Sequence, residues 1–357
     1  MRILYGVVGD GLGHAIRSSV VIENLIAKGH DVHVVASGRA TAYLESRFGE
    51  STRIWGLSLV MKDNEVSKRL TAAHNISGAL TGLPGNVVQF FDVEAEFDPQ
   101  LVISDFESWS WFFGKLFRVP IVCVDNIQII NRCHHDEKII AGDWEDFRTA
   151  KNVVKARTPQ ADCYLITTFF YPEVKKKRTE LVPPILRRNI LEAKPRKGAH
   201  LLVYQTSETF RDLPKLLQKL DCPVYVYGLR RDLQGAEVEG NLTYKPFSDD
   251  GFVHDLATAR GVIASAGFTL AGECVHLGKP YLATPVRHQF EQVMNARYIH
   301  ELGYGTYDER LDLSTIQNFV DNLETFEENL QGYERHDNTK LFTRLDELVD
   351  QAEAGLL

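Results

Sequence analysis

Residues 3–14 read ILYGVVGDGLGH. The run from Ile3 to Val8 is apolar and rich in β-branched residues, which is typical of a short buried strand. A glycine-rich turn follows, and apolar residues recur with helical spacing from Ile16 to Leu25. A basic last turn with a glycine ends this helix near Gly29, and residues 31–36 predict a second strand. The chain therefore opens with a strand, a helix and a second strand, which is the start of a parallel sheet.

The same alternation continues along the chain. Further buried strands are predicted at residues 101–104, 121–124 and 164–167, and then at 200–204, 224–227, 242–244, 262–264 and 281–284. Residues 171–197 interrupt the pattern with a basic run and several prolines, which we interpret as an inter-domain connection rather than a site for anionic lipid or nucleic acid. We expect an α/β protein with two Rossmann-like, doubly wound domains, residues 1–185 and residues 186–335.

Length and composition support two domains and limit the function. The chain has 357 residues, of which 44% are hydrophobic, whereas a single core rarely exceeds about 250 to 300 residues. Its 48 acidic and 40 basic side chains give a net charge of -8, which argues against a nucleic-acid partner. Five cysteines without a CxxC pair indicate neither a disulfide framework nor a zinc ribbon. Without a signal peptide or transmembrane segment, we expect a cytoplasmic protein that could lie against the inner face of a membrane.

The first glycine turn contains a candidate general base. Gly9, Gly11 and His14 stand at the three glycine positions of a dinucleotide-binding G-x-G-x-x-G pattern. Gly11 lets the backbone approach a ligand, and His14 should project toward the carboxyl ends of the strands. Asp105 follows a predicted strand at the same edge, where its carboxylate could orient the imidazole and stabilise its protonated form. A buried histidine at a helix start and an N-cap aspartate are the structural alternatives.

A second glycine turn lies at residues 264–273, which read ASAGFTLAGE. Backbone N–H groups of Gly267, Phe268 and Thr269, just after Ser265, would point at an anion such as a pyrophosphate. Glu273 lies nearly two helical turns further on, where its carboxylate could accept hydrogen bonds from two ribose hydroxyls. This order of phosphate site and ribose site predicts a nucleotide ligand.

A third group of candidates follows downstream. Glu291 and Gln292 are adjacent polar residues that could read the equatorial hydroxyls of a sugar, although a solvated helix start is the simpler interpretation without the preceding motif. Two weaker patterns are Cys133-His134-His135, whose contiguous spacing favours a loop over a metal site, and the aromatic run at 109–113, which could line an apolar acceptor pocket.

Residues 264–305 resemble the donor-binding motif of inverting GT-B glycosyltransferases, the group that holds the UDP-glycosyltransferases and the bacterial enzyme that adds N-acetylglucosamine to lipid-linked peptidoglycan precursor. In that family the turn at Gly267 meets the donor diphosphate, the acid at Glu273 holds the ribose, and the pair Glu291-Gln292, before Asn-Ala, contacts the donor sugar. The segment ending at Phe247 resembles the one beside the nucleobase. The family's glycine loop, whose histidine acts as acceptor base, resembles Gly9 to His14.

One departure from the family concerns the diphosphate. Plant-type members place a phosphate-binding histidine where this chain has Ser265, so the backbone, Thr269, Arg287 or His288 would have to take its place.

The resemblance implies a GT-B hexosyltransferase that needs neither metal nor cofactor. It would move a sugar from a nucleotide donor, which we expect to be a UDP-sugar, to an acceptor hydroxyl with inversion. The two domains would face each other across a cleft, and residues 336–357 would form a helix that packs back on the first domain. No motif identifies the acceptor, for which a lipid and a glycan are both open. The alternatives are a UDP-sugar 2-epimerase, an NADP-dependent oxidoreductase using Ser37-Gly38-Arg39, and a non-catalytic nucleotide-sugar binding protein.

Overall fold

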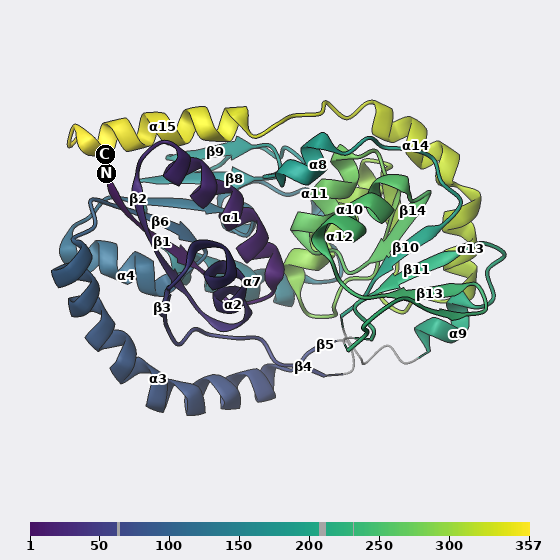
Figure 1. Cartoon of the computed structure of the whole chain (residues 1–357), viewed down its shortest axis with the longest axis horizontal. Coiled ribbons are helices and arrows are strands. Elements are labelled where there is room, and N and C mark those ends of the chain that lie inside the picture. The colour runs from purple at the N-terminus through teal and green to yellow at the C-terminus, as the bar shows by residue number, and fades with distance from the viewer. Residues whose placement is uncertain (63–64, 207–211, 231) are drawn as a thin grey trace. The chain divides into compact units, whose positions relative to one another are not determined.

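The computed structural model describes the whole chain except residues 63–64, 207–211 and 231. The chain divides into two compact units, labelled by element in Figure 1. The first contains Met1–Val60, Ser67–Leu186 and Asp337–Leu357, and the second contains Met61–Val66 and Arg187–His336. Residues 61–66 come from the first half of the sequence but belong to the second unit.

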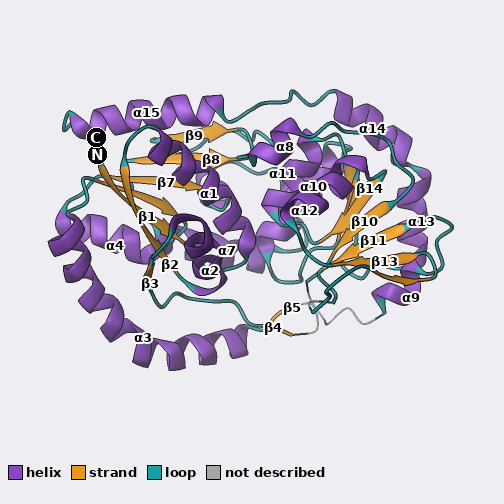
Figure 2. Cartoon of the chain, in the orientation of Figure 1, coloured by secondary structure: helices purple, strands orange, loops and turns teal. Residues whose placement is uncertain are grey.

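The first unit is built on a seven-stranded parallel sheet. Its strands, in spatial order, are β3 (Thr52–Arg53), β2 (Asp31–Ala36), β1 (Arg2–Val7), β6 (Leu101–Asp105), β7 (Ile121–Asp125), β8 (Cys163–Thr167) and β9 (Thr179–Val182). Every residue of β6, β7 and β8 is buried, as expected for parallel strands that are covered on both faces. The helices, purple in Figure 2, are α1 (Leu12–Ala27), α2 (Gly38–Phe48), α3 (Lys68–Phe97), α4 (Ser108–Phe117), α5 (Ile129–Arg132), α6 (Glu137–Ile140), α7 (Trp144–Arg157) and α15 (Thr339–Glu353).

The last helix completes the core of the first unit. Leu341, Leu345, Leu348 and Val349 of α15 are 0 to 2% exposed and pack in the same cluster as the residues of β1 and α1. Hydrophobic burial of this kind is the main contribution to folding, so the first core needs the end of the chain.

The second unit repeats the architecture. Its sheet has the order β12 (Glu237–Glu239), β13 (Leu242–Lys245), β11 (Val224–Tyr227), β10 (Leu201–Tyr204), β14 (Gly261–Ala264), β15 (Tyr281–Ala283) and β16 (Gly305–Tyr307). Only β12 runs antiparallel to its neighbour among these strands. Its helices are α8 (Arg188–Glu192), α9 (Leu213–Leu217), α10 (Asp249–Thr258), α11 (Phe268–His276), α12 (Phe290–Glu301), α13 (Leu313–Asp321) and α14 (Leu323–Gln331), and β4 (Met61–Lys62) with β5 (Glu65–Val66) form a separate hairpin.

The predicted strands are all present, but the interpretation of residues 171–197 as a connection is partly wrong. Residues 179–182 form β9, the edge strand of the first sheet, and residues 188–192 form α8. Three of the four residues of β9 are only half-buried, so this strand lacks the apolar run that marks the inner strands. The chain crosses from the first unit to the second at Leu186 and Arg187.

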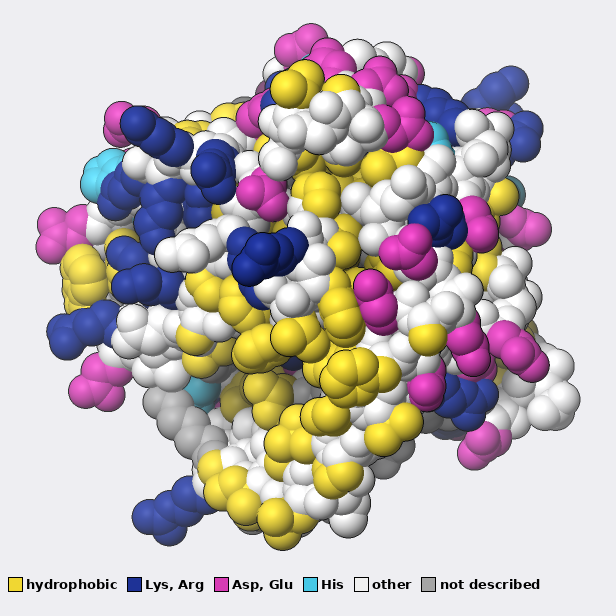
Figure 3. All heavy atoms as spheres, turned by 90° about the vertical axis from the view of Figure 1, so that its left-hand side faces the viewer, with side chains coloured by type: hydrophobic (Ala, Val, Ile, Leu, Met, Phe, Trp, Pro, Cys, Tyr) yellow, Lys and Arg dark blue, Asp and Glu magenta, His cyan; other side chains and the backbone are white. Residues whose placement is uncertain are grey.

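The long helix α3 exposes apolar side chains. Leu80 is 78% exposed and Phe91 is 60% exposed, and on the neighbouring α4 Phe112 is 59% exposed. Figure 3 shows hydrophobic side chains gathered on the face of the molecule that carries these helices. Even so, no helix within the described part of the chain is long and apolar enough to cross a membrane.

Candidate active-site residues

Both sheets have a point at which the strand order reverses, and several of the predicted site residues lie there. In the first sheet, β1 lies between β2 and β6, so the connections after β1 and β6 leave the carboxyl edge on opposite faces of the sheet. Such switch points form the ligand-binding crevice of doubly wound folds. The loop from Gly9 to His14 follows β1, and Asp105 is the last residue of β6.

His14 and Asp105 are in contact. Nδ1 of His14 lies 2.8 Å from Oδ1 of Asp105, and their side chains are 12% and 0% exposed. Gly11, with a φ of 91°, provides the backbone turn before α1, and a Cβ at Gly9 would lie 2.4 Å from the carbonyl oxygen of Ser37. The glycines therefore allow the tight turn that brings His14 to the end of β6.

Arg17, which the sequence analysis did not single out, completes this cluster. Its Nε donates to Oδ2 of Asp105 at 2.8 Å and its Nη2 to Oδ1 at 2.5 Å, while its Nη1 donates to Oδ1 of Asn126. Nη2 also lies 2.6 Å from Nδ1 of His14. Arg17 follows His14 by one helical turn on α1, and this spacing, beside an aspartate at a strand end, is the signal that could have identified it.

The charges in the cluster shift two pKa values in directions that suit a base. Burial favours the protonated form of Asp105, but the charges of Arg17 and His14 outweigh it and hold the pKa of this carboxyl at about 2. Burial, together with the charge of Arg17, lowers the pKa of His14 below 6.5, although Asp105 and Asp10 oppose that shift. An ionised carboxylate therefore faces an imidazole that is neutral at pH 7.

In the second unit, α11 begins directly after the turn that follows β14. Gly267 is the N-cap residue, and no side chain within the described residues caps the helix. Phe268 and Thr269 lie in the first turn, where backbone N–H groups have no partner within the helix. Ser265 lies just after β14, next to the reversal of strand order between β10 and β14. The geometry of a phosphate-binding helix N-terminus is thus present at this edge.

Glu273 is buried in an ion pair that the sequence analysis did not predict. Its two oxygens accept from Nε and Nη2 of Arg187 at 2.8 and 2.9 Å, and Nη1 of Arg187 lies 3.3 Å from Asp249. Burial raises the pKa of Glu273, and the charge of Arg187 opposes this. Each carboxylate oxygen keeps a second lone pair beside the ion pair.

Glu291 and Gln292 lie in the first turn of α12. Oε1 of Gln292 accepts from the backbone N–H of Val286 at 3.0 Å, and Oε1 of Glu291 accepts from Nδ2 of Asn295 at 2.8 Å. The same amide of Asn295 donates to the carbonyl of Ala266 at 3.0 Å. Asn295 therefore connects the candidate sugar-binding residues to the turn before α11.

The two remaining candidates follow β13 and β15, on either side of the reversal point in the same sheet. Phe247, after β13, is 50% exposed and lies near Phe252, with ring centroids 5.7 Å apart. Arg287, after β15, lies 3.5 Å from a carboxylate oxygen of Glu65, and its backbone carbonyl accepts from the N–H of Val66 in the β4–β5 hairpin. Phe247 is thus available as a stacking surface, whereas the Arg287 side chain lies beside an acidic partner.

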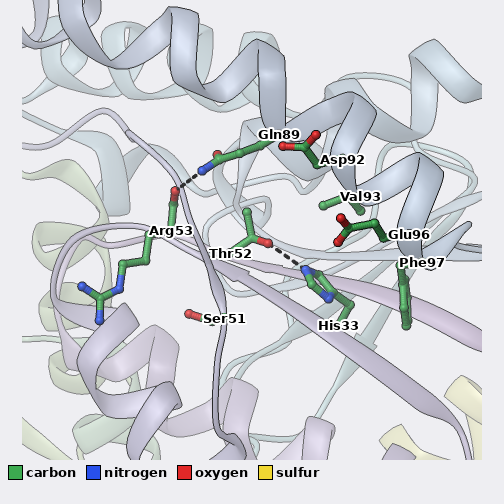
Figure 4. A pocket seen from close by; sticks show the side chains of 9 residues that line it. All are labelled: His33, Ser51, Thr52, Arg53, Gln89, Asp92, Val93, Glu96 and Phe97. Atoms are coloured by element: carbon green, nitrogen blue, oxygen red, sulfur yellow. Dashed lines mark hydrogen bonds between the residues drawn. The ribbon is translucent and has the colours of Figure 1, made fainter.

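A cavity of about 520 Å³ lies elsewhere in the first unit (Figure 4). His33 of β2, Thr52 of β3 and the C-terminal part of α3 line it, and Nε2 of His33 lies 2.8 Å from Oγ1 of Thr52. It contains none of the predicted site residues. Across the residues that the structure describes, no group of three or more His, Cys, Asp or Glu side chains could hold a metal ion, and His135 bonds to the carbonyl of Ile129.

Comparison with known proteins adds a family and a relative of similar sequence. Residues 1–324 match the family described as Glycosyl transferase family 1. An uncharacterized glycosyltransferase of Methanosarcina mazei is 23% identical over 398 residues, which cover 99% of this chain and 96% of that protein.

Two solved structures have a similar fold. The kitacinnamycin glycotransferase has a TM-score of 0.65 at 13% identity and covers 98% of both chains. A spinosyn rhamnosyltransferase complexed with thymidine diphosphate has a TM-score of 0.61 at 16% identity, covering 92% of this chain and 94% of that chain. These similarities confirm the predicted fold class of two Rossmann-like α/β domains.

Proposed function

The chain belongs to Glycosyl transferase family 1, and on this premise we propose that it moves a sugar from a nucleoside diphosphate donor to an acceptor hydroxyl with inversion, using His14 as the base. The glycosyltransferase class, which the sequence predicted, is confirmed. The observation that carries the proposed mechanism is the 2.8 Å contact between Nδ1 of His14 and the buried carboxylate of Asp105, at the switch point of the first sheet.

The acceptor step follows from the orientation of this pair. When Nδ1–H of His14 donates to Asp105, the lone pair of Nε2 is free to take the proton of the acceptor hydroxyl. The acceptor oxygen then attacks the anomeric carbon, and the bond from that carbon to the diphosphate oxygen breaks with its electron pair leaving on the diphosphate. A direct displacement of this kind inverts the anomeric configuration. The Asp105 carboxylate stabilises the imidazolium that forms.

The donor step uses the second unit. The N–H groups in the first turn of α11 and the positive end of its dipole would hold the leaving diphosphate without a cation. Glu273 would accept hydrogen bonds from the ribose, Phe247 would lie beside the base, and Glu291 with Gln292 would contact the sugar. The thymidine diphosphate bound to the spinosyn enzyme supports a nucleoside diphosphate ligand, and we expect uridine as the nucleoside here.

The alternatives of the sequence analysis are not favoured. A UDP-sugar 2-epimerase and an NADP-dependent oxidoreductase both fit Rossmann-like domains, but the family that matches residues 1–324 consists of glycosyltransferases. A non-catalytic protein would bind the donor without transferring its sugar. A screen for sugar transfer to candidate acceptors distinguishes such a protein from a transferase. We expect a hydroxyl acceptor, with lipid and glycan acceptors as the first two classes to screen.

A thermal-shift panel of nucleotides and nucleotide sugars, followed by a transfer assay, tests the proposal. UDP or a UDP-sugar should stabilise the protein, and Glu273→Gln should weaken that binding by about tenfold or more, because hydrogen bonds to a charged acceptor contribute about 1.5 to 3 kcal/mol each. Glutamine is preferred to alanine since it leaves a partner for Arg187. Glu328→Ala, at an exposed carboxylate in the same unit, is the control. Unchanged UDP affinity in folded Glu273→Gln would remove the ribose assignment.

A further inference from the structure

Arg17 is a buried arginine whose bonds to Asp105 and Asn126 lie around the candidate base. Its side chain is 3% exposed, and burying a guanidinium in the first core is costly unless its N–H groups are satisfied. The Nε and Nη2 groups form two parallel bonds to Asp105, and Nη1 bonds to Asn126, which follows β7. A hydrophobic residue would fill this place at lower cost, so a simple packing role does not account for the arginine.

Arg17 and Ser18 together occupy all but one of the acceptor positions of the Asp105 carboxylate. Oδ2 accepts from Nε of Arg17 at 2.8 Å and from the hydroxyl of Ser18 at 2.9 Å, while Oδ1 accepts from Nη2 of Arg17 at 2.5 Å. A carboxylate has about four lone-pair positions, and the one that remains on Oδ1 faces Nδ1 of His14. The two-point attachment also fixes the rotation of the carboxylate plane, which a single donor could not do.

This arrangement selects one tautomer of His14. If Nη2 of Arg17 donated to Nδ1, the imidazole lone pair would lie 2.8 Å from an ionised carboxylate oxygen with no proton between them, which is repulsive. The proton therefore belongs on Nδ1, where it is donated to Asp105, and Nε2 keeps its lone pair. Nη2 already donates to Oδ1 of Asp105, so at 2.6 Å from a protonated Nδ1 it makes no hydrogen bond to the ring, and its fixed positive charge disfavours a second proton there.

We propose that Arg17 is a positioning residue of the transferase, whose guanidinium holds Asp105 in the orientation that keeps the proton of His14 on Nδ1 and the resting ring unprotonated. The proposal rests on the proposed role of His14 as the base. The direction of the pKa of His14 agrees with this geometry: burial lowers it most, the charge of Arg17 lowers it further, and Asp105 and Asp10 raise it. Within the described part of the chain, these three side chains, from α1, β6 and the glycine loop, are the charged groups that act on the ring.

The test combines two substitutions with a readout that does not need activity. Arg17→Gln removes the charge, and Arg17→Lys keeps the charge but cannot make two parallel bonds. The pKa of His14 is measured by NMR titration of labelled imidazoles, with the His14 signal assigned from its loss in His14→Gln. The pH dependence of turnover is measured in parallel. Arg47→Gln, at a surface arginine of the same unit, is the matched control.

Arg17→Gln should raise the pKa of His14 by about one unit or more, since a charge within a few ångströms shifts a pKa by one to three units. The acid limb of the rate profile should move to higher pH by the same amount. Arg17→Lys should leave this pKa near its original value but lower turnover by about tenfold, because the carboxylate is no longer held at two points. Arg47→Gln should change neither quantity.

A His14 pKa that stays unchanged in Arg17→Gln, with only a lower melting temperature, would show that Arg17 is a structural ion pair and overturn the proposal. If Arg17→Gln does not fold, wild-type turnover in Arg17→Lys would overturn it as well. The proposed function is tested separately. If His14→Ala keeps its activity, the assignment of His14 as the base is wrong, while the NMR titration still reports whether Arg17 controls the pKa of the His14 ring.

Discussion

At the residue scale, His14 is the position at which catalysis and donor binding should separate. We expect His14→Ala to lower turnover by about 10² to 10⁴, which is the usual contribution of a positioned acid-base group. Donor affinity, measured by calorimetry, should stay nearly unchanged, because all proposed donor contacts except Gly11 are in the second unit. His254→Ala, at an exposed histidine of α10, is the control. Retention of most activity in His14→Ala would mean that the base is another group or belongs to the acceptor.

Asp105 gives the second residue-scale prediction, which concerns pH. The pKa of His14 is depressed below 6.5, mainly by burial, so the base form is fully present at pH 7 and turnover should fall as the pH drops through that lower value. Asp105→Asn keeps the ring in place but removes support for the imidazolium, and should lower turnover at pH 8 by the same factor as His14→Ala or less. Rate profiles from pH 5 to 9 measure both effects.

A wild-type profile that is still rising above pH 7 would contradict the assignment of its acid limb to His14. The Asp105 carboxyl also contributes stability through its pKa of about 2, below the ordinary value of 3.8. This contribution is present above pH 3.8 and is lost only as the pH falls toward 2. Asp105 therefore does not titrate between pH 5 and 7, and a loss of rate in that range does not come from unfolding caused by this carboxyl.

The sequence allowed His14 and Asp105 to be predicted because each follows a recognisable strand, and parallel strands end at a common edge. Arg17 is indicated only by its helical spacing from His14, and Arg187 by no pattern in the sequence. A buried arginine is recognised by its carboxylate partner, and these partners lie 88 and 86 positions away in the sequence. Only the fold shows that Glu273, expected to be free for a ribose, already holds a guanidinium.

At the element scale, α11 provides the reason to expect activity without a metal ion. A helix N-terminus carries about half a positive charge and N–H groups that have no partner inside the helix, which can neutralise part of the charge on a diphosphate. Turnover should therefore be the same before and after treatment with EDTA, when measured in buffers freed of divalent ions. Complete loss of activity with EDTA, and recovery with magnesium or manganese, would contradict a donor site built from amides alone.

The elements that the sequence predicts best are the inner strands, and the ones it misses lie at the edges. Residues 163–167 are an unbroken apolar and β-branched run because both faces of β8 are covered. The edge strand β9 is half-exposed and sits beside a basic run, so its residues look like a linker. Helix α3 is not predicted because its apolar residues are largely exposed and do not form a single face toward a core.

At the scale of the whole molecule, the chain leaves the first unit and returns to it at neighbouring points. The side chain of Asn338 accepts from the N–H of Leu186 at 2.9 Å and donates to its carbonyl at 2.8 Å. After the short stretch at Met61–Val66, the chain enters the second unit again directly after Leu186, and Asn338 follows its return by one position. A single buried amide therefore joins the two crossings, although 152 positions separate them in the sequence.

This connectivity makes the stability of the first unit depend on the last helix, and Leu345 is the residue that tests it. Leu345 is 0% exposed within the first core, so Leu345→Ala should lower the free energy of unfolding of that unit by about 2 to 5 kcal/mol through lost burial and a cavity. Leu356→Ala, at a leucine that is 77% exposed, should have little effect.

Nucleotide affinity should be unchanged in both variants, because the donor residues belong to the second core. Denaturant unfolding followed by circular dichroism, together with calorimetric titration of UDP, measures the two properties separately. If Leu345→Ala weakened UDP binding while leaving the first unit as stable as before, α15 would have to act on the donor site rather than on the core it completes.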